Sequence, residues 1–246
     1  MLTVIRKAMD RRDRAAKARA PARPNGLREK WQARLQRGDT LDEAESLALL
    51  SDYGVPVLPH RVVDNEADLM QAAQAFGAVA VKTAMPGILH KSDVGGVKLN
   101  VVDPAAAYRD LKDRLGPRVI VMPMAQEILK AKGVELSLGL TRDPQFGPIL
   151  MVGAGGTLIE LLKDRRFALP PFDESEALRH LNALALRPLL DGKRGAPPAD
   201  LPSLANALSR FSVLAADLGD LIAEADVNPL IAGPQGCVAL DALIVP

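Results

Sequence analysis

A lysine stands inside an apolar stretch of this sequence, and that combination can support chemistry. Lys82 follows Val79, Ala80 and Val81, and an ammonium group buried without a partner is unfavourable. Two interpretations are open. Alternation along a strand could turn the side chain to solvent, or the ammonium could reach into a cleft and hold phosphate oxygens.

The loop after this stretch favours the second interpretation. Residues 90–97 read His-Lys-Ser-Asp-Val-Gly-Gly-Val. Gly95 and Gly96 allow a tight turn and can offer backbone amides to an anion. A neutral imidazole, with its usual pKa of about 6.5, can accept a phosphoryl group, so His90 is a candidate nucleophile. Loop histidines are also commonly solvated side chains, and His90 alone leaves both readings open.

A second glycine cluster is weaker evidence. Gly153, Gly155 and Gly156 follow an apolar stretch, as in a dinucleotide-binding fingerprint, but Leu158 stands where the last glycine of that motif is needed. The sequence contains no G-x-x-x-x-G-K-[ST] motif, which excludes a P-loop.

The elements that must position these residues form a mixed α/β pattern without strict strand–helix alternation. Folded sequence is expected to begin at Thr40, where a Thr40–Glu43 capping box opens a helix that ends before Gly54. A lobe boundary is expected near residue 117. Further helices are predicted at 67–76, 103–115, 174–184 and 204–218, and strands at 57–63, 78–83, 97–102, 118–122, 134–140, 149–152, 221–225 and 238–245.

Composition narrows the class of protein. A chain of 246 residues with 48% apolar residues fits one or two ordinary globular domains. Its single cysteine excludes an internal disulfide and a cysteine-based metal cluster. No apolar run approaches the roughly 18–20 residues that span a bilayer, and the first residues lack the apolar stretch of a signal peptide. We therefore expect a cytoplasmic protein without a membrane partner.

The basic charge is concentrated at the start of the chain. Residues 1–38 carry twelve Lys/Arg and three Asp/Glu, whereas the rest of the chain is acidic. Such an arm could contact nucleic acid or anionic lipid. We favour a helix or linker that packs against another domain, with Arg23-Pro24-Asn25-Gly26 as linker sequence, and expect no nucleic-acid partner.

From Thr40 to its end, the sequence resembles the ATP-grasp domain of NDP-forming acyl-CoA synthetases, relatives of the succinyl-CoA synthetase β subunit. The H-K-S-D-V-G-G-V-x-L-N block at 90–100 is the most distinctive part of the match. The other matching pieces, in order, are L-x-E-A-E…L-L-x-x-Y-G-V-P-V at 41–57, D-P-x-F-G-P at 143–148, G-x-G-G-x-x-x-E-x-L-K-D at 153–164, L-x-G-x-R-G at 190–195 and E-x-D-V-N-P-L at 224–230.

The resemblance implies an α/β ATP-grasp fold of the α+β type, with ATP between two lobes. We assign residues 1–38 to a basic helical or linker arm, 39–116 to the N-terminal lobe and 117–246 to the C-terminal lobe. The implied ligands are ATP and Mg²⁺.

The resemblance also implies roles for particular residues. Lys82 would contact the α/β phosphates, with the Gly95–Gly96 turn nearby, and Glu135 would accept hydrogen bonds from the ribose. Met122 and Met124 would lie at adenine, although Pro123 between them removes a backbone amide.

The catalytic and metal-binding residues follow from the same comparison. His90 would be transiently phosphorylated, and Asp226 would orient it or hold a second metal. Asn228 and Asp241 would bind Mg²⁺, which needs few protein oxygens. Without the resemblance, Asn228-Pro229 reads as a turn signal and Asp241 as an exposed strand residue.

The family reaction joins a carboxylic acid to CoA with conversion of ATP to ADP and phosphate. CoA is then a co-substrate of the complete enzyme, which we expect to be an oligomer. A CoA-binding and acyl-phosphate domain does not fit within this chain and is expected as a fused or separate partner. The alternative functions are a nucleotide-sensing regulatory module without turnover, and a nucleic-acid-binding protein acting through residues 1–38.

Overall fold

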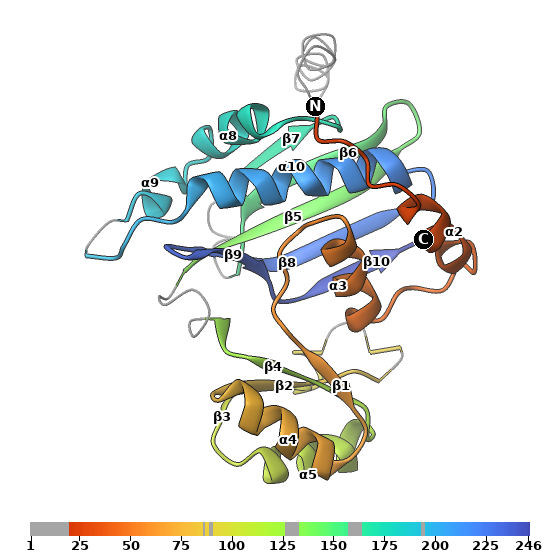
Figure 1. Ribbon diagram of the computed structural model, residues 1–246, viewed down its shortest axis with the longest axis vertical. Coiled ribbons are helices and arrows are strands. Elements are labelled where there is room, and N and C mark those ends of the chain that lie inside the picture. The colour runs from red at the N-terminus through yellow and green to blue at the C-terminus, as the bar shows by residue number, and fades with distance from the viewer. Residues whose placement is uncertain (1–19, 86, 89–90, 126–132, 157–163, 193–194) are drawn as a thin grey trace.

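Two antiparallel sheets, one in each of two lobes, organise the chain (Figure 1). The computed structural model describes residues 20–85, 87–88, 91–125, 133–156, 164–192 and 195–246. Its smaller lobe, at the bottom of Figure 1, contains a four-stranded sheet, and its larger lobe contains a six-stranded sheet.

The small sheet has the strand order β1-β4-β2-β3, and every neighbouring pair is antiparallel. Helices α4 and α5 cover one face and share an apolar core with Val79, Val81, Val119 and Val121. The elements are β1 (Arg61–Val63), α4 (Glu66–Phe76), β2 (Val79–Thr83), β3 (Val97–Val101), α5 (Pro104–Leu115) and β4 (Val119–Pro123).

Strand alternation gives the small sheet its second buried face. Because successive side chains point to opposite sides, Ala80 and Lys82 of β2 face away from α4 and α5. Ala80 pairs with Met122 and Lys82 with Ile120 on β4, and the apolar members of this group belong to the core of the large lobe. Lys82 is 6% exposed, so the interpretation that it points to solvent is wrong.

The large sheet has the order β10-β8-β5-β6-β7, and β9 pairs with β8. Helices α8 and α10 lie across one face of it, and α3 packs beside β10 (Figure 1). The elements are α2 (Leu27–Leu35), α3 (Glu43–Asp52), β5 (Val134–Asp143), β6 (Gly147–Ala154), β7 (Arg165–Ala168), α8 (Glu174–Asn182), α9 (Arg187–Leu190), α10 (Leu201–Leu218), β8 (Glu224–Gly233), β9 (Gly236–Ala239) and β10 (Ala242–Val245).

Two local expectations are corrected. The first helix is capped by Asp42 and Glu45, each side chain accepting from the other's amide at 2.8 and 3.1 Å, and not by Thr40 and Glu43. The sequence around Asn228-Pro229 is not a turn between strands, because β8 continues through it with a shift in register against β5.

The expected lobe boundary at residue 117 differs from the sheet topology. β4 pairs with β1 and β2 in the small sheet, so the chain passes to the large sheet only after Pro123. An apolar strand buried on both faces does not reveal by its pattern which sheet it joins. Helix α3, expected in the first lobe, contributes Leu47 and Leu50 to the core of the large lobe.

The chain is folded before Thr40. Helix α2 buries Trp31 and Leu35 against the large lobe. The guanidinium of Arg28 forms two hydrogen bonds with the carboxylate of Asp220, at 2.9 and 2.6 Å. This helix therefore belongs to the folded unit, whereas the sequence placed it in a basic arm.

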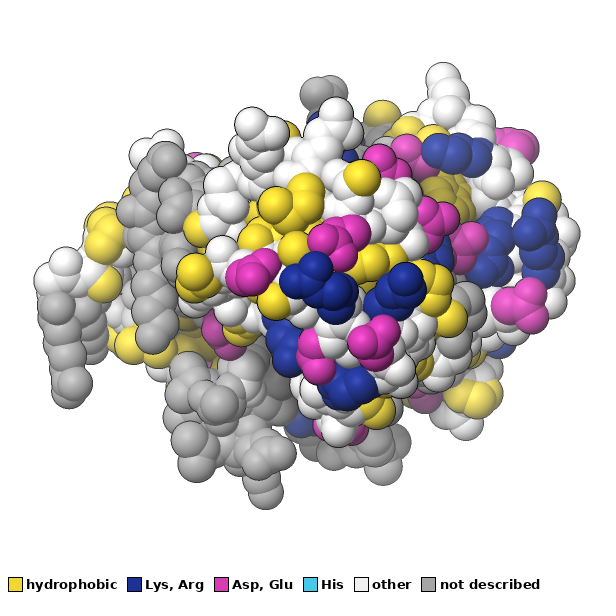
Figure 2. All heavy atoms as spheres, turned by 90° about the horizontal axis from the view of Figure 1, so that it is seen from below, with side chains coloured by type: hydrophobic (Ala, Val, Ile, Leu, Met, Phe, Trp, Pro, Cys, Tyr) yellow, Lys and Arg dark blue, Asp and Glu magenta, His cyan; other side chains and the backbone are white. Residues whose placement is uncertain are grey.

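No described helix is long and apolar enough to cross a membrane. On the face seen in Figure 2, basic side chains are interspersed with acidic ones. Arg109 pairs with Glu66, and Lys98 with Asp110. On the part of this face that the structure describes, no continuous basic surface is seen.

We predict that Trp31→Ala lowers the free energy of unfolding by about 3–5 kcal/mol, because it empties a packed site and removes the 2.8 Å hydrogen bond from Nε1 to Asp52. Urea denaturation followed by circular dichroism measures the effect. Met70→Ala is the control, since Met70 is 45% exposed and should change stability by about 0.5 kcal/mol or less. Equal effects of the two substitutions would show that α2 is not part of the cooperative unit.

Candidate functional site

A cavity of about 340 Å³ lies between the two lobes. Its walls come from β2, β3 and β4 of the small lobe and from β5, β8 and the residues before β10 of the large lobe. It brings together residues that are far apart in the sequence, such as Lys82 and Asp241, which are 159 positions apart. Six of the predicted site residues line it, namely Lys82, Met122, Met124, Glu135, Asn228 and Asp241.

The ammonium of Lys82 is held from the large-lobe side. Its Nζ lies 2.9 Å from Oε1 of Glu43, 2.7 Å from the carbonyl oxygen of Leu240 and 3.3 Å from Oδ2 of Asp241. Burial alone would lower the pKa of Lys82, but the two carboxylates outweigh it and hold that pKa above its ordinary value. The two carboxylates therefore favour the charged form of this desolvated lysine.

Asn228 and Asp241 are neighbours through the backbone. The amide of Asn228 donates to the carbonyl oxygen of Asp241 at 3.2 Å, where β8 runs beside the start of β10. Both residues line the cavity. The side-chain amide oxygen of Asn228 and the carboxylate of Asp241 are therefore available at the same wall. Among the described residues, no group of three or more His, Cys, Asp or Glu is arranged so that it could hold a metal ion by itself. This donor set fits a hard cation such as Mg²⁺ whose remaining ligands are water and phosphate.

Asp226 lies outside the cavity lining, although it lies on the same strand as Asn228 and two residues before it. Loss of solvent around the carboxyl group, together with the negative charges of Glu224 and Asp241, raises its pKa. Asp226 pairs with Leu243, two residues after Asp241, so it lies near the predicted metal pair.

Gly155 and Gly156, in the second glycine cluster, pack against Glu135 without side chains of their own. The amide of Gly155 donates to the carbonyl oxygen of Glu135 at 2.9 Å. A side chain at Gly156 would overlap Oε2 of Glu135, and Gly156 also has a φ of +56°, which favours glycine. The cluster that failed as a dinucleotide fingerprint therefore allows a close approach between β5 and the end of β6.

Met122 lies on β4 and Met124 directly follows that strand, and both line the cavity. Pro123 has no amide proton, and the amide of Met124 donates to the carbonyl oxygen of Ala78 at 2.9 Å. At these two positions the strand has no free backbone donor for a base. Met122 and Met124 instead contribute flexible, polarisable side chains to the cavity wall.

The Gly95–Gly96 turn differs from its expected role. The amide of Gly95 donates to the carbonyl oxygen of Ser92 at 3.1 Å, and that of Gly96 to the carbonyl oxygen of Lys91 at 2.7 Å. Neither glycine lines the cavity. The amides that we expected to face an anion are therefore used inside the turn, because the chain must fold back tightly onto β2.

His90, the predicted phosphoryl acceptor, lies outside the described residues. Two residues at the site were not assigned from the sequence, namely Glu43 and Lys91. Glu43 was interpreted as a capping residue. Lys91 has no role assigned from the sequence. Neither residue type nor spacing shows that the two side chains meet.

Comparisons with known proteins identify the family to which the chain belongs. A family model described as an ATP-grasp domain matches residues 32–245. Acetate–CoA ligase [ADP-forming] I of Archaeoglobus fulgidus is 36% identical over 220 residues, which are 86% of this chain and 32% of that protein. The β subunit of acetate–CoA ligase [ADP-forming] I of Pyrococcus furiosus is 32% identical over 220 residues, 83% of this chain and 91% of the subunit.

A solved structure gives the same result. Acetyl-coenzyme A synthetase 1 of Ca. Korarchaeum cryptofilum, in complex with coenzyme A and Mg-AMPPCP, superposes with a TM-score of 0.73 at 34% identity, over 89% of this chain and 99% of that chain. The fold is therefore an ATP-grasp fold, as predicted from the sequence.

The chain belongs to the ATP-grasp family and, within it, to the group formed by the β subunits of ADP-forming acyl-CoA ligases and the equivalent parts of fused enzymes. It spans about a third of the fused Archaeoglobus relative, 32% of its length, but nearly all of the Pyrococcus subunit. The resemblance identified in the sequence is confirmed.

We predict that Gly96→Ala destabilises the protein by about 1–3 kcal/mol. The new Cβ would lie 2.6 Å from Cγ2 of Thr83 and 3.0 Å from the carbonyl oxygen of Lys91. Thermal unfolding of Gly96→Ala and of Thr83→Ser/Gly96→Ala tests the cause, since the second variant removes the clashing methyl group and should regain part of the loss. If it regains none, the methyl group is not the cause of the strain.

Proposed function

We propose that this chain binds Mg-ATP between its lobes and transfers phosphate as the nucleotide-handling component of an ADP-forming acyl-CoA synthetase. One observation carries the proposal. Six residues assigned to ATP and Mg²⁺ from the sequence line a single cavity between the lobes.

The residues of the cavity have distinct tasks in this proposal. The ammonium of Lys82 neutralises phosphate oxygens, and Glu135 accepts hydrogen bonds from the ribose hydroxyls. Met122 and Met124 contact adenine. Asn228 and Asp241 hold Mg²⁺, which when bound supplies neutralisation of phosphate charge.

The group transferred is the terminal phosphoryl group. A ring nitrogen of His90 forms a bond to the γ-phosphorus while the bond to the β–γ bridging oxygen breaks, and ADP leaves with that oxygen. Asp226 orients the histidine. The phosphorylated His90 then passes its phosphoryl group to the partner domain.

The whole reaction needs more protein than this chain contains. The complete enzyme would convert a carboxylic acid, CoA and ATP to acyl-CoA, ADP and phosphate. A separate or fused CoA-binding component is the proposed partner, which the fused Archaeoglobus relative and the separate Pyrococcus β subunit support. The solved Korarchaeum structure contains coenzyme A and Mg-AMPPCP, which supports CoA and Mg-ATP as the ligands of the complete enzyme. An oligomeric complete enzyme and a cytoplasmic location stay predictions.

The proposal predicts phosphoryl transfer to His90. The purified chain, incubated with γ-³²P-ATP and Mg²⁺, should acquire acid-labile, base-stable label, and His90→Asn should abolish that label while leaving ATP affinity within about twofold. His60→Asn is the matched control, because His60 hydrogen bonds locally to the carbonyl oxygen of Leu58 and should retain full labelling.

Other outcomes would revise the proposal. ATP binding without label, even after addition of a CoA-binding partner, would indicate a nucleotide-sensing module. Absence of both binding and label would remove ATP as the ligand. Loss of binding in His90→Asn would give His90 a structural role.

Lys82→Met is predicted to weaken Mg-ATP binding by about 10- to 100-fold, because it removes a charge-assisted contact worth about 1.5–3 kcal/mol. Isothermal titration calorimetry measures the change. Lys112→Met, on the exposed side of α5, serves as the control and should bind normally. An unchanged affinity in folded Lys82→Met would exclude Lys82 from the phosphate site.

A further inference from the structure

A second lysine shares the carboxylates that hold Lys82. Nζ of Lys91 lies 2.9 Å from Oε2 of Glu43 and 3.5 Å from Oδ1 of Asp241. Each carboxylate therefore gives one oxygen to each lysine, since Lys82 takes Oε1 of Glu43 and Oδ2 of Asp241. The result is a closed ring of two cations and two anions, which we call the lysine–carboxylate ring.

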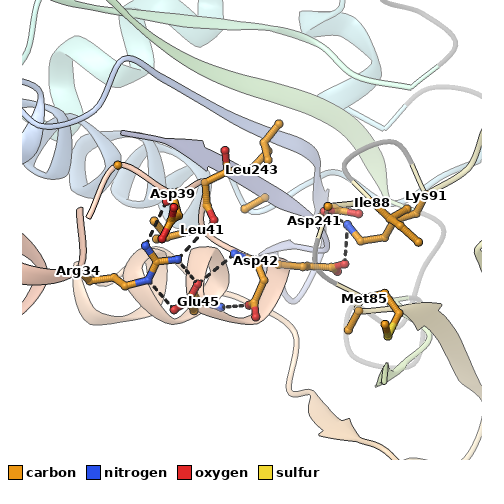
Figure 3. A pocket seen from close by; sticks show the side chains of 16 residues that line it. Arg34, Asp39, Leu41, Asp42, Glu45, Met85, Ile88, Lys91, Asp241 and Leu243 are labelled. Atoms are coloured by element: carbon orange, nitrogen blue, oxygen red, sulfur yellow. Dashed lines mark hydrogen bonds and ion pairs between the residues drawn. The ribbon is translucent and has the colours of Figure 1, made fainter. Parts of the chain in front are cut away.

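The two carboxylates of the ring differ in access. The side chain of Glu43 is wholly buried, whereas that of Asp241 is 29% exposed. Asp241 lines both the 340 Å³ cavity and an adjoining pocket of about 680 Å³ that contains Lys91. Figure 3 shows Lys91 and Asp241 pointing toward one another at one end of that pocket. An entering ligand can thus replace Asp241 as a partner of the lysines, whereas the carboxylate of Glu43 is not accessible to it.

The backbone holds Lys91 beside Lys82. The carbonyl oxygen of Lys91 accepts from the amide of Gly96 at 2.7 Å, and the carbonyl oxygen of Gly96 accepts from the amide of Thr83 at 2.7 Å. The turn is also fixed from α5, because Arg114 donates to the carbonyl oxygens of Val94 and Gly95 at 3.1 and 3.0 Å. Lys91 is therefore tied to the residue that follows Lys82.

From this arrangement we propose that Lys91 is a second phosphate-binding cation and that Glu43 is the positioning residue that holds both ammonium groups. The ligand class is a nucleoside polyphosphate, so the inference rests on the proposed function. When the polyphosphate enters, Lys82 and Lys91 exchange Asp241 for phosphate oxygens while Glu43 keeps both lysines in place. Asp241 is then free to hold the cation.

The test compares ligands with and without phosphate. Isothermal titration calorimetry gives the Kd of Mg-ATP, and NMR titration gives that of adenosine, for the wild-type chain, Lys91→Met and Lys91→Gln. Both variants should bind Mg-ATP at least about tenfold more weakly and adenosine unchanged. Lys91→Gln can still donate a hydrogen bond to Glu43, so it provides a folded variant if Lys91→Met unfolds.

Lys98→Met is the matched control, because Lys98 lies on β3 of the same lobe and pairs with Asp110 at 2.8 Å; it should bind both ligands normally. Glu43→Gln should weaken Mg-ATP but not adenosine. If Glu43 acts through the lysines, Glu43→Gln/Lys91→Gln should lose less than the product of the two single losses.

The outcomes separate this inference from the proposed function. A wild-type chain that does not bind Mg-ATP overturns both. If the wild-type chain binds Mg-ATP and folded Lys91→Gln binds it with an affinity within twofold of the wild type, the role of Lys91 alone is overturned. Equal weakening of Mg-ATP and adenosine shows a merely structural role and also overturns it. Independent, multiplicative losses in the double variant would overturn the positioning role of Glu43.

Discussion

Burial of Lys82 in the small sheet requires a carboxylate that is buried with it, and the arrangement of the lobes depends on that pair. Glu43 supplies the carboxylate from the first turn of α3, and α3 packs beside β10 of the large lobe. A buried ion pair adds little net stability, but loss of one partner costs about 3–5 kcal/mol because the other charge is left alone. The pair therefore fixes where the small sheet meets the large lobe. Apolar contacts of Ala80, Ile120 and Met122 complete the same interface.

Much of the site could be predicted because its residues carry strong local signals. A lysine within an apolar strand indicates a special environment, and the strand period predicts that it shares a face with Ala80. Asn228 and Asp241, in contrast, depended on the resemblance, since by themselves Asn228-Pro229 reads as a turn signal and Asp241 as an exposed strand residue. They lie on the same wall of the cavity because β8 pairs with β10. A short-range sequence pattern cannot predict this long-range pairing.

The misassigned parts share a physical cause, which is tertiary contact between segments far apart in the chain. Glu43 satisfies the local rule for a capping box, but Asp42 takes that role and leaves Glu43 to pair with lysines 39 and 48 residues away. Four of the nine residues of α2 are charged, which concealed the burial of Trp31. The polar sequence Asp226-Val227-Asn228-Pro229 has the composition of a turn, yet pairing with β5 and β10 keeps it within β8.

The same ring limits how a ligand can enter the cavity. Opening the lobes at β2 would separate Lys82 from Glu43 and leave two charges unpaired in the interior, which is costly. At β3 the small sheet has an edge strand, and Leu99 on that strand is 61% exposed while lining the cavity. Entry beside β3 therefore breaks no buried ion pair. A polyphosphate that arrives by this side meets the exposed partner, Asp241, before the buried one, so the exchange of carboxylate for phosphate can proceed while Glu43 holds the lysines.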